Sequence, residues 1–196
     1  KSIEIKILTD EMKKKEEQNT NEKYINSFLS AKEVEGCSIR TIKYYRENIE
    51  NLITKLDKNI KIVTTEDIRK YLSDYKELHK CSSVTIDNLR RIFSSFFSWL
   101  EDEDYIIKSP VRRIHRVKTA TLVKETFSDE NIETMRDECK FIRDLAMIEL
   151  LYSTGIRVGE LVNLNQEDIN FEERACIVQG KGNKQREVLM QEQKYI

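Results

Sequence analysis

Residues 154–190 read TGIRVGELVNLNQEDINFEERACIVQGKGNKQREVLM, and this stretch decides how the rest of the chain is interpreted. The largely apolar run before it, residues 144–153, predicts a helix that stops at Gly155, and a second helix is expected to begin at once with Ile156-Arg157-Val158. After a polar connection, a strand is predicted at residues 175–179 and a returning strand at residues 186–190. The Gly-Lys-Gly-Asn-Lys turn between them makes a hairpin.

This arrangement places one arginine at a helix start and one lysine at a hairpin tip. A guanidinium matches two oxygens of one phosphate, whereas a lysine supplies a point charge and a proton. Glu160 lies three residues after Arg157, on the same helical face, and is expected to orient its guanidinium. Lys181 lies between two glycines, where the backbone can approach a ligand closely. Together the residues suit a tetrahedral or planar oxyanion.

Simpler interpretations of the same residues exist. An arginine at a helix start is usually a solvated charge, and a Gly-Lys-Gly-Asn-Lys segment is usually only a turn. Phosphate-binding loops of nucleotide-binding proteins do not fit, because Gln185 stands where a dinucleotide fingerprint needs its third glycine. The sequence also contains no Gly-Lys-Ser or Gly-Lys-Thr run.

Both motifs, in this order, resemble the catalytic domain of the tyrosine site-specific recombinases, the phage integrase family. The family's T-G-[LI]-R-[VI]-x-E-L corresponds to residues 154–161, and its G-K-G-N-K-x-R corresponds to residues 180–186. The resemblance implies that Arg157 and Lys181 are catalytic and that Glu160 supports Arg157. It implies a mainly α fold, with a four-helix, SAM-like core-binding domain before the first half of an α+β catalytic domain that has a small antiparallel sheet.

The composition favours a protein built mainly from helices. The chain has 196 residues, 35% of them charged, with one proline and five glycines, which favours long helices over many turns. The net charge is −1, so DNA binding must depend on local basic patches. The four cysteines and two histidines show no zinc-ligand spacing, so we expect reduced thiols, no metal and no cofactor. No apolar run reaches membrane length, and a cytoplasmic protein is expected.

Four segments are predicted along the chain. Residues 1–20 form an N-terminal extension, with a short extended or frayed start followed by a solvated helix. Residues 21–107 form the helical DNA-gripping domain, in which an aromatic stripe is interpreted as core. Residues 108–125 form a basic linker, predicted to be an extended strap along DNA phosphates, because residues 105–124 hold six basic residues and no acidic one. Residues 126–196 begin the catalytic domain, opening on a helix capped by Ser128.

Candidate DNA-binding residues are the cations and hydroxyls on the outer faces of two helices, in the linker and in the hairpin. They are Arg40, Thr41, Lys43, Arg46, Thr85, Asn88, Arg90, Arg91, Arg112, Arg113, Arg116, Lys118, Lys184 and Arg186.

The family completes its site with a His-x-x-Arg, a further histidine or tryptophan, and a tyrosine nucleophile. No His-x-x-Arg occurs here, and Tyr195 follows the lysine too soon to be assigned a catalytic role. We therefore expect the chain to be part of a larger enzyme, binding duplex DNA but not cleaving it, whereas the intact enzyme recombines DNA as a homotetramer on paired sites. The alternatives are a truncated, non-catalytic DNA-binding or regulatory relative and, less well supported, a helical protein-interaction domain.

Overall fold

The computed structural model describes residues 2–118, 123–180, 182 and 184–190, with side chains from residue 18 onward and for Glu16. The chain divides into two compact units, residues 1–121 and 122–196. Each unit has its own set of buried apolar side chains.

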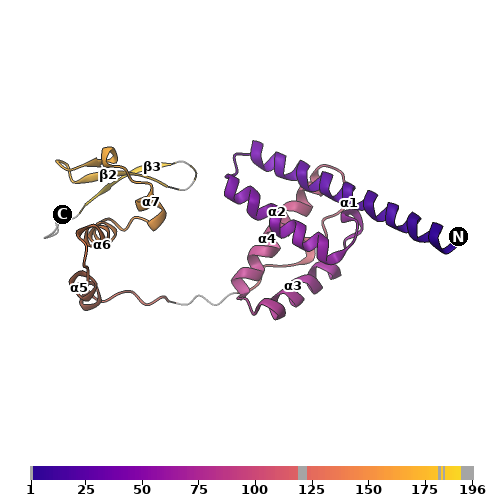
Figure 1. Ribbon diagram of the computed structural model, residues 1–196, viewed down its shortest axis with the longest axis horizontal. Coiled ribbons are helices and arrows are strands. Elements are labelled where there is room, and N and C mark those ends of the chain that lie inside the picture. Colours follow the sequence, from indigo (N-terminus) through magenta and orange to yellow (C-terminus); the bar gives the residue numbers. More distant parts are fainter. Residues whose placement is uncertain (1, 119–122, 181, 183, 191–196) are drawn as a thin grey trace. The chain divides into compact units, whose positions relative to one another are not determined.

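The first unit contains the four helices that the sequence predicts (Figure 1). They are α1 (Ser2–Val34), α2 (Ile39–Leu56), α3 (Thr65–His79) and α4 (Ser83–Asp102), with a short 3₁₀ turn, η1 (Ile60–Ile62), before α3. Local capping explains where they begin: the Ser38 and Ser82 hydroxyls accept backbone N–H groups of α2 and α4. Thr64 and Asp67 form a reciprocal capping box at the start of α3.

The start of the chain differs from the prediction. A short extended or frayed start and then a solvated helix were expected before a further helix from residue 21, but α1 runs without a break from Ser2 to Val34. The sequence explains the difference, because residues 2–20 contain no proline or glycine and are rich in lysine and glutamate, which are good helix formers. The predicted boundary at residue 20 therefore does not coincide with the end of an element.

The core of the first unit is aromatic, as the sequence predicts. Phe28 of α1 and Phe93, Phe96 and Phe97 of α4 are fully buried. The Phe28 ring meets the Phe96 ring edge-on, with centroids 5.2 Å apart. This stripe is thus unavailable for stacking on bases, and any DNA contact must come from the outer faces of the helices.

The beginning of the basic linker also differs from the prediction of an extended strap. Residues Pro110–Arg113 form a 3₁₀ helix, η2, and Val111 is buried in the core of the first unit. The Thr65 hydroxyl donates to the Pro110 carbonyl (2.7 Å), and the Ser109 amide donates to the Glu101 carboxylate (2.8 Å). The chain therefore leaves the first unit after this packed segment, not at residue 108.

The second unit combines three helices with a small antiparallel sheet, the fold that the sequence predicts. The helices are α5 (Asp129–Asp137), α6 (Ile142–Thr154) and α7 (Val158–Val162), followed by the 3₁₀ turn η3 (Gln166–Asp168). The sheet has the order β1 (Ile169–Asn170), β2 (Ala175–Gln179) and β3 (Gln185–Leu189). Strands β2 and β3 are the predicted hairpin, and β1 is an additional strand that the sequence did not suggest.

The core of the second unit is small and lies between α7, the end of α6 and β2. Ile156, Cys176 and Val178 are its buried members. Helix α6 was expected to be apolar almost all round, yet its fully buried side chain is Glu149, whereas Ile142 is 87% exposed. An ion pair with Arg136, described below, accounts for the buried carboxylate.

Candidate active site

The connection between α6 and α7 fixes the position of Arg157. Gly155 ends α6 in the left-handed conformation (φ 63°), which glycine adopts without steric cost, and its amide donates to the Leu151 carbonyl (2.9 Å). Ile156 is buried against β2, and Arg157 follows as the residue that begins α7. Because Ile156 anchors the backbone in the core, Arg157 projects from a fixed point, with 76% of its side chain exposed.

Glu160 holds the guanidinium of Arg157, as the sequence predicts. Its side chain is only 5% exposed, and each carboxylate oxygen accepts two hydrogen bonds. The oxygen Oε1 accepts from Nη1 of Arg157 (3.0 Å) and Nη1 of Arg186 (2.8 Å). The oxygen Oε2 accepts from the Arg157 amide (2.9 Å) and Nη2 of Arg186 (2.8 Å). Arg186, predicted from sequence only as a DNA contact, thus forms a two-pronged ion pair with Glu160.

These contacts lower the pKa of the Glu160 carboxyl to about 2 from its ordinary 4.5. The hydrogen bonds from Arg186 are the largest cause, followed by the bond from the Arg157 amide. A carboxyl whose pKa is lower in the folded state stabilises that state fully above its ordinary pKa, and the contribution disappears as the pH falls towards the folded value.

We therefore expect the start of α7 to loosen between pH 4.5 and about pH 2. The measurement is the hydrogen-exchange protection of the Arg157 amide, corrected for intrinsic exchange, in the wild type and in Glu160→Gln. The difference between the two proteins should be constant above pH 4.5 and vanish near pH 2. A difference that disappears already above pH 4.5 would contradict the ion-paired geometry.

The hairpin that carries the predicted lysine closes directly beside this carboxylate. The Gly180 amide donates to the Lys184 carbonyl (2.8 Å). A Cβ atom at Gly180 would lie 3.3 Å from Nη1 of Arg186 and 3.5 Å from Oε1 of Glu160. A side chain at Gly180 would thus lie against the ion pair and would require the Arg186 guanidinium to move by a few tenths of an ångström. Lys181, the predicted proton donor, lies outside the described residues, as does Tyr195.

A second buried ion pair links α5 and α6. Nε and Nη2 of Arg136 donate to the fully buried Glu149 carboxylate at 2.5 and 3.0 Å. Glu133 accepts a further hydrogen bond from the same guanidinium, which also lies 5.3 Å from the centre of the Tyr152 ring. The carboxylates hold the pKa of Arg136 above its ordinary value. Sequence patterns gave no indication of this pair, because its partners come from different helices.

The candidate DNA contacts on α2 are on the surface. Arg40, Thr41 and Lys43 are exposed and line a shallow hollow at the start of the helix. Arg46 is half-buried, where it donates to the Glu50 carboxylate (3.1 Å) and the Asn26 side chain (2.9 Å). Part of its charge is therefore neutralised within the unit.

On α4, two of the candidate arginines form ion pairs with a buried aspartate. Asp87 is 5% exposed, and it accepts from Nε of Arg90 (2.9 Å), Nε of Arg91 (3.0 Å) and the Val117 amide (3.1 Å). These contacts lower the pKa of the Asp87 carboxyl, with Arg90 the largest cause. Arg90 is only 15% exposed, whereas Arg91 is 59% exposed. Of the other two candidates on this helix, Asn88 is exposed and Thr85 is half-buried.

The remaining candidates lie on the packed linker and the hairpin. Arg113, Arg116, Lys118 and Lys184 are exposed. Arg112 pairs with Glu101 at 3.4 Å and remains 65% exposed. Each therefore has access to solvent, and their contact with DNA stays a prediction.

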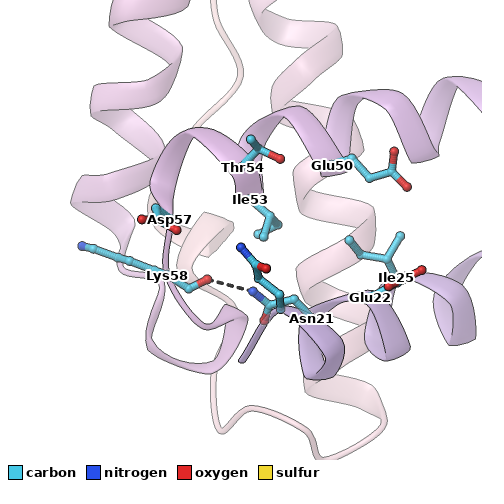
Figure 2. Close-up of a pocket in the computed structure, with 9 residues that line it drawn as sticks. Asn21, Glu22, Ile25, Glu50, Ile53, Thr54, Asp57 and Lys58 are labelled. Carbon is cyan, nitrogen blue, oxygen red and sulfur yellow. Dashed lines mark hydrogen bonds between the residues drawn. The ribbon is translucent and has the colours of Figure 1, made fainter. Parts of the chain in front are cut away.

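The hollow between α1 and α2 contains none of the candidate residues (Figure 2). Asn21 lies at its floor, where its amide donates to the Lys58 carbonyl (2.9 Å) and its oxygen accepts from the Ile60 amide (2.9 Å). Its polar groups are thus used to hold the turn after α2. Within the described ranges, no cluster of three or more histidine, cysteine or acidic side chains is arranged to bind a metal. No described helix is both long and apolar enough to cross a membrane.

The chain is similar to known sequences in both of its units. Residues 24–107 match the family described as "Phage integrase, N-terminal SAM-like domain", and residues 125–196 match the phage integrase family. The chain is 32% identical over 180 residues to the tyrosine recombinase XerC of Oceanobacillus iheyensis. The matched region covers 87% of this chain and 59% of that protein. It is 34% identical over 172 residues to XerC of Staphylococcus aureus strain MSSA476, covering 82% and 56%. The chain thus spans less than two thirds of these relatives.

Solved structures show the same fold. A lambda integrase tetramer bound to a Holliday junction superposes with a TM-score of 0.68 at 21% identity, covering 86% of this chain and 50% of that one. The Tn1549 transposon integrase in complex with circular intermediate DNA gives a TM-score of 0.61 at 24% identity, covering 84% and 60%. With matches to both of the family's domains and homology to XerC along most of its length, the chain belongs to the tyrosine recombinase, or phage integrase, family.

Proposed function

We propose that this chain acts in site-specific DNA recombination, by cleavage and rejoining of DNA strands through a 3′-phosphotyrosyl intermediate. The observation that supports it best is the exposed Arg157 guanidinium, held from behind by the buried Glu160 carboxylate. A cation fixed in this way can meet the charge that develops on a phosphate without reorganising. The XerC relatives carry the name of tyrosine recombinases.

In this mechanism Arg157 stabilises the non-bridging oxygens of the scissile phosphate as a tyrosine attacks the phosphorus atom. Lys181 donates a proton to the departing 5′-oxygen, so that the leaving group is a hydroxyl and not an alkoxide. The 5′-hydroxyl of a partner strand then attacks the phosphotyrosyl bond and releases the tyrosine. Each phosphodiester broken is replaced by a phosphotyrosyl ester, so the exchange consumes no nucleotide.

The first unit and the exposed cations of the linker hold the duplex in this proposal. Arg40 and Lys43 on α2 and Arg91 on α4 are exposed cations on the outer faces of the helical bundle. Such contacts position a protein on DNA without reading its sequence. One structural relative is a lambda integrase tetramer on a Holliday junction. A homotetramer on two recombination sites, in the cytoplasm, is the corresponding assembly for the intact enzyme.

The nucleophile is proposed to come from outside residues 1–196. No His-x-x-Arg occurs among them, and Tyr195 lies only 14 positions after Lys181. The relatives are longer than the segment that this chain matches. The chain by itself is accordingly expected to bind DNA and to form no covalent adduct.

DNA binding by this chain should weaken steeply with salt. If several of the candidate cations contact phosphates, the logarithm of the affinity should fall with the logarithm of the salt concentration with a slope of about −0.9 per contact. The measurement is a fluorescence-anisotropy titration of a duplex at several salt concentrations. Arg40→Ala combined with Lys43→Ala should reduce the slope by roughly two units, whereas Arg143→Ala, on α6, should leave it unchanged. A slope near zero would contradict the proposal that cations of this chain bind DNA phosphates.

A non-catalytic DNA-binding relative that occupies recombination sites is the alternative function. It predicts the same salt dependence but no downstream His-x-x-Arg and tyrosine in the reading frame, and no covalent DNA adduct from any form of the protein. A helical protein-interaction domain predicts no salt-dependent affinity for duplex DNA. Sequencing past residue 196, with a test for trapped phosphotyrosyl DNA, separates these possibilities.

A further inference from the structure

We propose that Arg186 is a positioning residue for Arg157: it neutralises Glu160, and thereby leaves the positive charge of Arg157 available for the scissile phosphate. This inference rests on the proposed function and specifies how its site is charged. It also departs from the prediction of Arg186 as a DNA contact.

The charges around Glu160 carry the argument. A carboxylate with a single arginine partner makes a neutral ion pair, which has little net attraction for another anion. Here one buried carboxylate faces two guanidinium groups, so the three side chains together carry one positive charge. Arg186 takes the two-pronged position with both distances at 2.8 Å, whereas Arg157 contributes only Nη1 of its side chain, at 3.0 Å. The remaining nitrogens of the Arg157 guanidinium, on a side chain 76% exposed, are not bonded to Glu160.

The sheet register explains why Arg186 can do this. Arg186 pairs with Val178 across the hairpin, and Val178 is a buried member of the second core. Paired residues of an antiparallel ladder point to the same face, so Arg186 points towards the side of the sheet that packs on α7. Its side chain is 43% exposed, less than the 76% of Arg157. Gly180 leaves the room that its guanidinium occupies.

Removing Arg186 should therefore act on Arg157. The buried Glu160 carboxylate would lose two of its four hydrogen bonds and would draw the free nitrogens of Arg157 into a paired geometry, because a buried charge without partners is costly. Arg157 would then meet the phosphate as half of a neutral pair. If the charge of Glu160 is removed in the same protein, no carboxylate draws the Arg157 guanidinium away from the phosphate.

The test compares Arg186→Gln with the double variant Arg186→Gln, Glu160→Gln. In the chain alone, without DNA, the rate at which phenylglyoxal modifies Arg157 is followed by mass spectrometry. Arg186→Gln should slow this modification about 5- to 10-fold, because a guanidinium paired on two sides with a carboxylate is a poor nucleophile. The double variant should recover most of the wild-type modification rate. Hydrogen exchange across β2 and β3 checks that both variants are folded. Arg143→Gln, which removes an exposed cation paired with Asp144, is the control for net charge and should behave as the wild type.

In the full-length protein, the same variants are assayed for cleavage of a suicide DNA substrate and for DNA affinity. Arg186→Gln should reduce the single-turnover cleavage rate about 10- to 100-fold with affinity nearly unchanged, and Glu160→Gln added to it should restore part of the rate. If Arg186→Gln instead lowers affinity and reduces the salt slope by about one unit, with bound DNA cleaved normally, Arg186 is a phosphate contact and the inference is wrong.

The two arms also separate this inference from the proposed function. If the modification rates follow the expected pattern but the wild type neither binds nor cleaves DNA, the recombinase proposal fails and the arrangement of charges stands. If the double variant modifies Arg157 as slowly as the single variant in a folded protein, neutralisation of Glu160 is not the role of Arg186.

Discussion

Arg157→Ala in the full-length protein should lower the rate of DNA strand cleavage by about 10²- to 10³-fold, the usual cost of removing one fixed donor from a developing oxyanion. Its affinity for duplex DNA should change only a few-fold, because a single phosphate contact is a small part of an interface with many cations. The structural reason is that Arg157 is fixed by Ile156 and Glu160 and exposed at its tip. It is arranged to meet one phosphate, not to add to a broad positive surface.

The measurement is a paired gel-shift and suicide-substrate assay at one salt concentration. Lys181→Ala should show the same separation of binding from cleavage, because loss of a general acid affects only the departure of the 5′-oxygen. Arg143→Ala removes a cation that is 78% exposed and bonded to Asp144, and should leave both quantities unchanged. Equal losses of binding and cleavage in Arg157→Ala would mean that the residue only binds DNA. The proposed transition-state role would then be abandoned.

Local sequence patterns predicted the features that depend on contacts between residues close together in the chain. The cap at Ser128 was predictable because an N-cap hydroxyl bonds to an amide two or three residues later, and Ser38, Thr64 and Ser82 begin their helices in the same way. The stop at Gly155 depends on its own backbone conformation in the same way. The contact of Arg157 with Glu160 was predictable because both residues lie within a single helical turn.

The residues that sequence reasoning missed depend on partners far away in the chain. Glu160 and Arg186 are 26 positions apart, and Arg136 and Glu149 are 13 apart on different helices. No periodicity within one element can identify such a pair. One signal was present for Arg186: alternation along the hairpin places it on the same side as Val188, which packs against the second core. An arginine on the strand face that packs on α7 can reach a carboxylate there, and such a contact could have been considered in advance.

The same reasoning explains the two differences in the first unit. Residues 2–20 lack helix-breaking residues, but without a partner surface in the sequence pattern the length of α1 could not be decided. The one-signed charge of residues 105–124 suggested an extended linker, whereas Val111 and Pro110 within it are buried. These two residues, together with hydrogen bonds of Ser109, Pro110 and Val117, attach the segment to the helical core. Charge patterning indicates which residues face solvent, but it does not show where the backbone packs.

Glu149→Ala should destabilise the second unit by about 3 kcal/mol, since it removes the buried, two-pronged partner of the Arg136 guanidinium and leaves that mostly buried cation with weaker compensation. Glu149 is fully buried, and Arg136 is 15% exposed with a two-pronged bond to it. The matched control is Glu133→Ala, which removes an acceptor from the same guanidinium at a position that is 65% exposed. That change should cost less than about 1 kcal/mol, as exposed ion pairs usually do.

The measurement is hydrogen exchange of the β2 and β3 amides in the whole chain, as a function of denaturant, which reports on the second unit without requiring it to be isolated. The pair joins α5 to α6, and α6 ends at the glycine that sets the start of Arg157's helix. If stability is lost as expected, Glu149→Ala in the full-length protein should reduce cleavage only in proportion to the unfolded fraction, and mild cooling or added DNA should recover it. If the two glutamate variants are equally stable, the Arg136–Glu149 contact is not what holds α5 and α6 together. The stability of this unit must then come from the small apolar cluster around Ile156.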